Sequence, residues 1–380
     1  MECKTYRPDT IADLRIMGRT NGSRDPVVLF WTGSCAEVNV AASELWFEAE
    51  ADYAMFEPWI DIVIDGELTQ RFMLTRGRHR ICVFRGMTPS EAKDVRIVRD
   101  TQAMPDDPDN YLAILSLSTD GRFCPLPEKQ LKMEFIGDSI TSGEGGCGRL
   151  GEMDWVSGCF DAYHNYARET ADALNAEYNV LSQSGWGVHC AWNGNIRQAL
   201  PLYYGQVCGV LQGERNRRLG AQKDWDFASW RPDLIVINLG TNDNGAFDQP
   251  DWTDPDTGEI SSMRRNADGT LCAEDLRKFT EDGRAFLGRL RSCNKDSRII
   301  WTYGMLGSEM LPAIREIVNG YREQTGDRNV EVLQLPDAAD TGFGSRQHPG
   351  RSAHRAAAAV LIGRIREILQ STSAETASIS

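Results

Sequence analysis

The stretch Phe135-Ile136-Gly137-Asp138-Ser139-Ile140-Thr141-Ser142-Gly143-Glu144-Gly145 decides how the second half of the chain is interpreted. Its apolar start predicts a buried strand that ends at Gly137, and a turn rich in serine and glycine follows at once. Open α/β sheets place their ligands at the carboxyl ends of parallel strands. A tight turn there can present the Ser139 hydroxyl as a nucleophile. Because Gly-Asp-Ser also begins ordinary turns, the rest of the chain must supply the partners.

The segments after residue 130 alternate between strand and helix patterns. We expect strands at 133–137, 178–182, 233–239, 298–303 and 330–335, and helices at 161–176, 272–291, 311–321 and 353–369. Such alternation predicts a parallel sheet covered by helices, the α/β class. We place this domain at residues 131–370 and expect the polar tail 371–380 to be disordered.

The part of the chain before residue 130 has a different pattern. Short runs alternate apolar and polar residues, and Asp65-Gly66 and Asp120-Gly121 are hairpin turn signals. Several short strands at this spacing predict a β-sandwich over residues 1–130. The pattern changes at Pro125-Leu126-Pro127.

Composition narrows the class of partner. The 380 residues carry a net charge of −14, which disfavours nucleic acid and anionic membranes because both require basic surfaces. None of the ten cysteines forms a Cys-x-x-Cys pair, so free thiols in a reducing compartment are favoured over disulfides. The first residues, Met1–Arg7, lack an apolar core typical of export signals, and we expect a cytoplasmic protein. The sequence leaves the oligomeric state open.

Three further strand ends supply candidate partners for Ser139. Gly185 follows the second expected strand, with Gly187 as its rival; Asn242 follows the third, and His348 lies in the last loop. Strand ends of one parallel sheet share an edge, so these groups can converge. Together they provide a nucleophile, a base and oxyanion donors. The alternative histidines are His79, His164, His189 and His354.

The ordered blocks Gly137-Asp138-Ser139, Gly185, Gly240-Thr241-Asn242-Asp243 and His348-Pro349 resemble the SGNH (GDSL) hydrolase family over about residues 131–370. This resemblance implies a three-layer α/β fold and catalysis without a cofactor. It also implies that Ser139 and His348 are catalytic and that Ser139, Gly185 and Asn242 form the oxyanion hole.

Three further features make the resemblance more specific, to one family of carbohydrate esterases. The preceding β-domain, the stretch Ser184–Val188 and the stretch Trp230–Asp243 are similar to carbohydrate esterase family 2. Members of that family join a jelly-roll domain to an SGNH domain and remove acetyl groups from plant polysaccharides.

The chain departs from the SGNH pattern at Ser345. The family usually carries an aspartate three residues before the histidine, where it orients the imidazole and stabilises its charged form. Asp340, Asp337 or a backbone carbonyl could take this role. We favour the carbonyl, with Asp340 second.

The resemblance leads to three hypotheses on function. The first is a serine esterase that removes O-acetyl groups from plant-type oligo- or polysaccharides through an acyl-enzyme on Ser139. The alternatives are a lipid-directed esterase (lysophospholipase or thioesterase) and a non-catalytic carbohydrate-binding protein. Among the loop tryptophans, Trp186 beside Gly185 is our candidate for stacking on sugar. No cysteine–histidine cluster has zinc spacing, and the acidic turn Asp254–Gly258 lacks the other ligands of a calcium loop.

Overall fold

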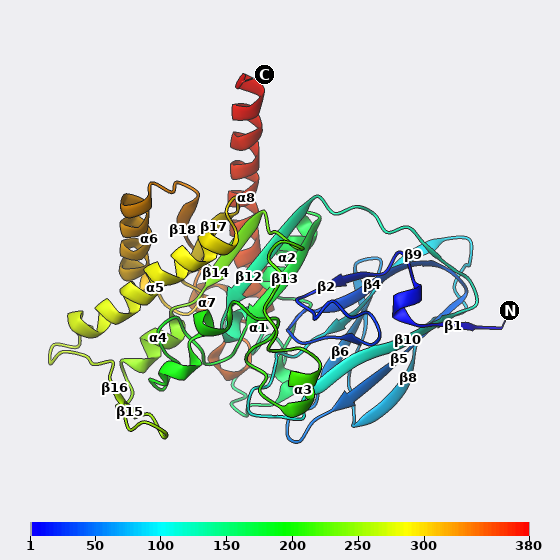
Figure 1. The fold of residues 1–380 in the computed structure, drawn as a ribbon, viewed down its shortest axis with the longest axis horizontal. Helices are drawn as coiled ribbons and strands as arrows, with labels where there is room; N and C mark the ends of the chain where they lie inside the picture. The colour runs from blue at the N-terminus through cyan, green and yellow to red at the C-terminus, as the bar shows by residue number, and fades with distance from the viewer. Residues whose placement is uncertain (1, 380) are drawn as a thin grey trace.

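The computed structural model describes residues 2–379 and contains two parts (Figure 1). An all-β sandwich comes first in the chain, and a parallel sheet flanked by helices follows it. The boundary that we expect near residue 130 falls between the last sandwich strand and the first strand of the parallel sheet. The predicted class, an α/β hydrolase domain behind an all-β domain, is confirmed.

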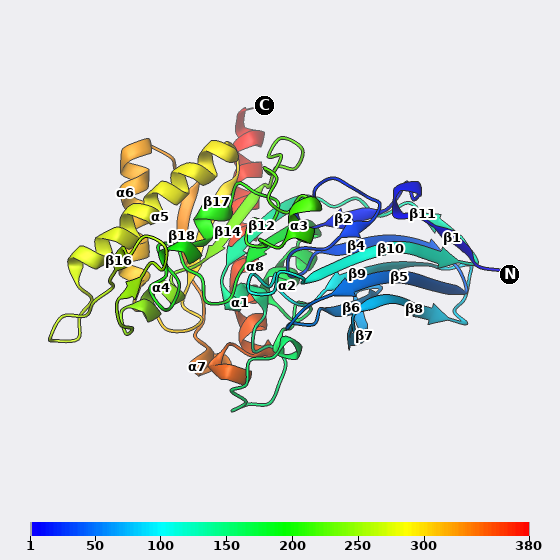
Figure 2. The same ribbon diagram turned by 60° about the horizontal axis from the view of Figure 1, so that its bottom comes forward.

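The sandwich is built from two antiparallel sheets, whose long strands run roughly horizontally in Figure 2. One sheet has the order β1-β10-β5-β8, with β3 also paired to β10; the other has the order β11-β4-β9-β6-β7, with β2 paired to β4. The strands span Lys4–Tyr6 (β1), Arg15–Met17 (β2), Val27–Val28 (β3), Cys35–Ala41 (β4), Glu44–Asp52 (β5), Trp59–Ile64 (β6), Glu67–Met73 (β7), Gly77–Arg85 (β8), Ala92–Arg99 (β9), Tyr111–Thr119 (β10) and Arg122–Cys124 (β11). Alternate residues of both sheets fill one shared apolar core, as Phe47 and Val38 illustrate.

The second sheet is entirely parallel, with the order β13-β12-β14-β17-β18. Its strands span Leu131–Gly137 (β12), Ala176–Ser182 (β13), Leu234–Asn238 (β14), Arg298–Tyr303 (β17) and Val330–Gln334 (β18). All five agree with the expected strands to within a few residues. The chain runs from β12 to one side and then crosses back to the other, so the crevice that binds ligands in such sheets lies beyond β12 and β14.

Helices cover both faces of this sheet. The helices α2 (Tyr166–Ala173) and α8 (Arg351–Ile379) pack together over one face, and α5 (Ala273–Cys293) and α6 (Leu311–Thr325) over the other. The shorter helices are α1 (Ser139–Ser142), α3 (Glu214–Arg218), α4 (Thr241–Ala246) and α7 (Ala338–Thr341), and a small hairpin is formed by β15 (Trp252–Thr253) and β16 (Ile260–Ser261). The three layers are therefore helix, sheet and helix.

Two helix boundaries differ from expectation. The helix expected from residue 161 begins at Tyr166, because Asn165 caps it and Asp161 is held in polar contacts of its own. The tail expected to be disordered from residue 371 continues α8 as far as Ile379, where the sequence offers no glycine or proline to end the helix. Residue 380 lies outside the described residues.

Two further properties concern the whole described chain. All ten cysteines carry free thiols, and four of them are buried. Within residues 2–379, no helix combines the length and the apolar character needed to cross a bilayer.

Candidate active site

The register of the parallel sheet explains why distant residues meet. Gly137 at the end of β12 pairs with Ser182 of β13 on one side and with Asn238 of β14 on the other. The chain therefore leaves three neighbouring strands at the same level, and the loops that carry Ser139, Gly185 and Asn242 begin side by side. This common level is the structural basis of the site.

Ser139 is the first residue of the short helix α1. The carboxylate of Asp138 caps this helix by accepting a hydrogen bond from the backbone N–H of Ile140 at 3.0 Å. Burial raises the pKa of Asp138 to about 7. Its side chain thus orders the turn, while Ser139 itself is 6% exposed.

His348 lies in hydrogen-bond contact with the serine. Its Nε2 is 2.9 Å from Ser139 Oγ, and its Nδ1 is 2.9 Å from the backbone carbonyl of Arg346. A carbonyl oxygen only accepts, so Nδ1 must carry the ring proton of the neutral imidazole. Nε2 then presents its lone pair to the serine hydroxyl. The backbone carbonyl therefore supplies the orientation that an aspartate usually supplies, as we favoured from the sequence.

The residue that provides this carbonyl is itself held tightly. Arg346 has left-handed backbone angles (φ 55°, ψ 28°), which are unfavourable for a residue with a side chain. Its guanidinium Nε donates to the buried Glu144 carboxylate at 2.7 Å, and Nη1 donates to the Met153 carbonyl at 2.6 Å. Glu144 also lies 3.9 Å from His348 Nε2, so it places negative charge near the imidazolium that forms when His348 takes a proton.

Three N–H groups are available for an oxyanion. Among the described residues, no hydrogen bond is made by the backbone N–H of Ser139 or of Gly185. Asn242 Nδ2 donates to the Trp186 carbonyl at 2.9 Å, and the amide retains a second hydrogen. The donors that we expected thus share one cavity with unpaired hydrogens.

The surroundings of Gly185 and Gly187 show which of the two glycines lies at the catalytic cavity. Gly185 has φ +81° and lines the cavity. A Cβ on Gly187 would lie 2.4 Å from the Asp243 carboxylate, which accepts from the backbone N–H groups of Val188, His189 and Cys190. Gly187 is therefore required for packing, and Asp243 fixes the loop that carries Gly185. Sequence reasoning did not identify this anchoring role of Asp243.

The cavity around these groups has a volume of about 390 Å³. Its lining consists of Ser139, Glu144, Trp155, Ser184, Gly185, Trp192, Asn242, Arg346 and His348. Polar and aromatic side chains thus surround the serine, a lining suited to a ligand with hydroxyl groups and ring faces. Among residues 2–379, no group of three or more His, Cys, Asp or Glu side chains could hold a metal ion.

Two of the residues that we singled out do not take the expected place. Asp340 is exposed on α7, and His348 Nδ1 bonds to the Arg346 carbonyl instead. The Trp186 ring is 5% exposed and packs in the core against Tyr203, with ring centroids 5.1 Å apart. Trp186 contributes its carbonyl to Asn242, whereas Trp155 and Trp192 present rings to the cavity.

The alternative histidines lie in other environments. His354 is buried beside Tyr166, with stacked ring centroids 6.1 Å apart, and burial lowers its pKa to about 4. His189 pairs with Asp282, His164 with Asp161, and His79 with the Thr75 carbonyl. Of the five, His348 alone contacts Ser139.

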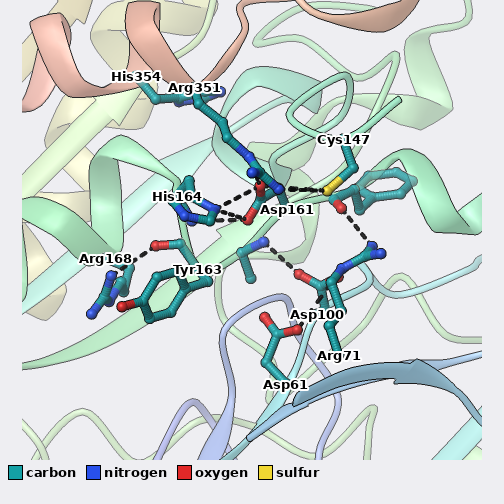
Figure 3. A network of polar contacts seen from close by, with 12 residues as sticks. Asp61, Arg71, Asp100, Cys147, Asp161, Tyr163, His164, Arg168, Arg351 and His354 are labelled. Atoms are coloured by element: carbon teal, nitrogen blue, oxygen red, sulfur yellow. Dashed lines mark hydrogen bonds and ion pairs between the residues drawn. The ribbon is translucent and has the colours of Figure 1, made fainter. Parts of the chain in front are cut away.

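A polar network around the buried carboxylates of Asp161 and Asp100 holds the loop that follows Ser139 (Figure 3). Asp161 binds Arg351, the first residue of α8, at 2.7 Å and His164 at 2.9 Å. From the sandwich, Asp100 accepts from the backbone N–H of Ala162 at 2.6 Å and pairs with Arg71 at 2.7 Å. The two domains are thus joined by charged groups directly behind the loop that follows Ser139.

This arrangement defines a class: an α/β domain with a serine–histidine pair and an oxyanion pocket at its strand ends. The model of the GDSL-like Lipase/Acylhydrolase family matches residues 135–356, which is more than half of the chain. The chain therefore belongs to this family.

Solved structures and curated relatives agree with that membership. An acetyl xylan esterase (Est2A) from the rumen bacterium Butyrivibrio proteoclasticus is similar over 97% of this chain and 99% of that one, with 44% identity and a TM-score of 0.96. A family two carbohydrate esterase from Clostridium thermocellum in complex with cellohexaose shares the fold over 94% of this chain and 99% of that one, with 23% identity and a TM-score of 0.75.

Among curated proteins, an acetylxylan esterase / glucomannan deacetylase from Cellvibrio japonicus is 28% identical over 234 residues, which cover 60% of this chain. The cellulase/esterase CelE from Acetivibrio thermocellus is 26% identical over 348 residues, which cover 89% of this chain. The chain spans 61% of the length of the first and 37% of the second.

Proposed function

We propose that the protein is a serine esterase that removes O-acetyl groups from plant-type oligo- or polysaccharides. The observation that carries this proposal is the 2.9 Å contact between Ser139 Oγ and His348 Nε2, in a cavity that also holds unpaired N–H donors. The 44% identity to an acetyl xylan esterase over nearly the whole chain supports the choice of substrate.

The reaction follows from the positions of the hydrogens. His348 Nε2 takes the proton of Ser139 as Oγ attacks the acetyl carbonyl carbon. The N–H groups of Ser139 and Gly185 and the Asn242 amide stabilise the oxyanion. The imidazolium then gives its proton to the sugar oxygen, which leaves as an alcohol. Water activated by His348 releases acetate from the acetyl-Ser139 intermediate.

The lining of the cavity separates this proposal from a lipid-directed esterase. A long acyl chain requires an apolar groove that continues from the nucleophile. Here Glu144, Arg346 and Asn242 lie beside Ser139, and the apolar contribution comes from two indole rings. Polar groups and aromatic faces match a sugar ring better than an alkyl chain.

Acetate release tests the proposal. Acetylated xylo- and manno-oligosaccharides should yield acetate, and simple esters should be cleaved more slowly as the acyl chain lengthens beyond about four carbons. Ser139→Ala should reduce turnover on the order of 10⁶-fold while oligosaccharide binding is retained. Rates that rise with acyl length would favour the lipid-directed alternative, and sugar binding without acetate release would favour a binding protein.

The free thiols support a reducing, cytoplasmic location as part of the proposal. Titration of the denatured protein, purified without reductant, should find all ten thiols. A lower number would contradict this location.

A further inference from the structure

A second cavity adjoins the catalytic one. This outer cavity, of about 200 Å³, shares Trp155 and Ser184 with the catalytic cavity. Its opposite wall comes from the sandwich, which contributes Phe56 and Asp106. The sandwich thus lines a cavity that borders the catalytic one.

The wall contributed by the sandwich is held rigidly. The buried Asp107 carboxylate accepts from the backbone N–H groups of Ala54, Met55 and Phe56 at 2.8–3.0 Å. Asn110 Nδ2 binds the Phe56 carbonyl at 2.7 Å. These bonds fix the loop before β6, so the Phe56 ring needs little ordering when a ligand arrives.

Two aromatic rings meet across the domain boundary at this cavity. Phe56 packs edge-to-face against Trp155, with ring centroids 4.9 Å apart and an interplanar angle of 76°. Both rings are half-buried. The carbon-bound hydrogens of a sugar ring can pack on such faces.

Polar atoms at the same place lack partners. Gln183 Oε1 and Ser184 Oγ are buried and have no hydrogen-bond partner among the described residues. Buried polar atoms without a partner are costly, and both residues lie in the wall of the outer cavity. Pockets for drug-sized ligands measure about 300–1,000 Å³. The outer cavity, at about 200 Å³, is smaller than these pockets and matches a smaller ligand such as a single sugar ring.

We propose that the outer cavity is a subsite for the sugar residue next to the acetylated one. This inference rests on the proposed function and adds that the enzyme selects oligosaccharides over acetylated monosaccharides. The sandwich then recognises substrate without taking part in the chemistry.

A comparison of a long and a short substrate distinguishes a role in the subsite from a general effect on the active site. Phe56→Ala should lower kcat/KM for an acetylated xylotetraose roughly tenfold and leave kcat/KM for p-nitrophenyl acetate unchanged. Met55→Ala, an exposed neighbour outside the cavity, is the matched control and should change neither value. Asp106→Ala provides a second variant, because this exposed side chain can be removed without disturbing the core.

Calorimetry with unmodified xylotetraose on the Ser139→Ala protein gives a readout without turnover. Phe56→Ala in that background should weaken binding by a similar factor. Equal losses on both esters, or an unchanged value on the tetraose, would overturn the subsite and leave the esterase proposal standing. Failure of the unmodified enzyme to release acetate from any acetylated sugar would instead overturn the proposed function, and the subsite with it.

Discussion

The sandwich and the parallel sheet each hold polar groups near the site, and these groups differ in how completely they are paired: Arg99 in the first and the oxyanion donors in the second. In the sandwich, Arg99 is 1% exposed and its guanidinium donates to the carbonyls of Leu29, Thr101 and Gln102 and to the Asn110 side chain. At the strand ends of the parallel sheet, N–H groups remain unpaired.

The paired groups make the structure rigid, whereas the unpaired groups are available to the reaction. The hydrogen bonds of Arg99 fix the loop that carries Gln102. Gln102 forms part of the wall of the outer cavity. Unpaired groups around Ser139 are prepared to stabilise charge that appears only during the reaction. Changes in the parallel sheet should therefore affect chemistry most, and changes in the sandwich should affect selection, alignment and stability.

After removal of the nucleophile itself, the largest effect that we predict concerns the unpaired amide hydrogen. Asn242→Ala should reduce kcat about 10²–10³-fold with a small change in KM, since the lost hydrogen bond is made chiefly to the oxyanion. Steady-state kinetics on an acetylated oligosaccharide measures this. A loss confined to KM would show that Asn242 binds the ground state. It would contradict the view that the unpaired donors act only during the reaction.

The ion pair that holds Arg346 should have the next largest effect. Glu144→Gln keeps the shape of the side chain but removes its charge, which weakens the hold on the Arg346 carbonyl and the support for the imidazolium. We expect kcat to fall roughly 10–100-fold, equivalent to a hydrogen bond to a charged group.

The split between kcat and KM tests whether Glu144 acts through His348. Its carboxylate lies 3.9 Å from Nε2, and the imidazolium forms only during the reaction, so Glu144→Gln should lower kcat with little change in KM. Glu152→Gln, in the adjoining loop, is the control and should change neither value. A loss confined to KM in Glu144→Gln would contradict a role through His348.

A smaller effect should follow from removing a hydrogen bond that joins the two domains. Gln102 Oε1 accepts from the backbone N–H of Ser184 at 2.8 Å, one residue before Gly185. Gln102→Ala should lower kcat/KM by roughly 3–10-fold, equally for p-nitrophenyl acetate and for the tetraose, because it loosens an oxyanion donor. A loss on the tetraose alone would assign Gln102 to the outer cavity instead.

The smallest effect that we predict is on stability alone. Burial and the neighbouring Asp100 charge raise the pKa of Asp61 to about 9. The folded protein therefore binds a proton that the unfolded chain releases near pH 4. This stabilisation is complete below about pH 4 and is lost as the pH rises towards 9.

Asp61→Asn mimics the protonated acid, so its Tm should fall less than that of the unmodified protein between pH 5 and pH 9. A difference of a few degrees is expected, since about 1 kcal/mol shifts Tm by roughly 2–4 °C in domains of this size. Asp100→Asn should instead lower Tm at every pH, because it deprives Arg71 of its 2.7 Å partner. Identical pH slopes for Asp61→Asn and the unmodified protein would contradict the raised pKa of Asp61.

Sequence periodicity was sufficient to predict the parallel sheet and to predict that Ser139, Gly185 and Asn242 lie close together. The strands are continuous apolar runs, and the site residues follow them within a few positions, so the common level of the strand ends places Ser139, Gly185 and Asn242 together. The start of α2 was missed because Asp161 is held by tertiary contacts, which no local pattern reveals.

The orientation of loop side chains could not be predicted in the same way. Trp186 is adjacent to Gly185 in sequence, yet its ring turns into the core. Trp192 reaches the cavity because its backbone N–H folds back onto the Gly185 carbonyl at 2.9 Å. The left-handed backbone of Arg346 is likewise imposed by the Glu144 and Met153 contacts, and nothing in the Arg–Gln–His sequence signals it.

The carbonyl that orients His348 has a consequence for how this site can change over time. A main-chain oxygen is present whatever side chain stands at its position, so no single codon change can delete the acceptor. Position 345, where the SGNH pattern described above places an aspartate, therefore does not need an acid to orient the histidine. Ser345 instead donates its hydroxyl to the Cys147 carbonyl at 2.8 Å, which ties the histidine loop to the nucleophile loop. A change at position 345 would therefore alter how these two loops are held together, while the acceptor of the histidine would remain.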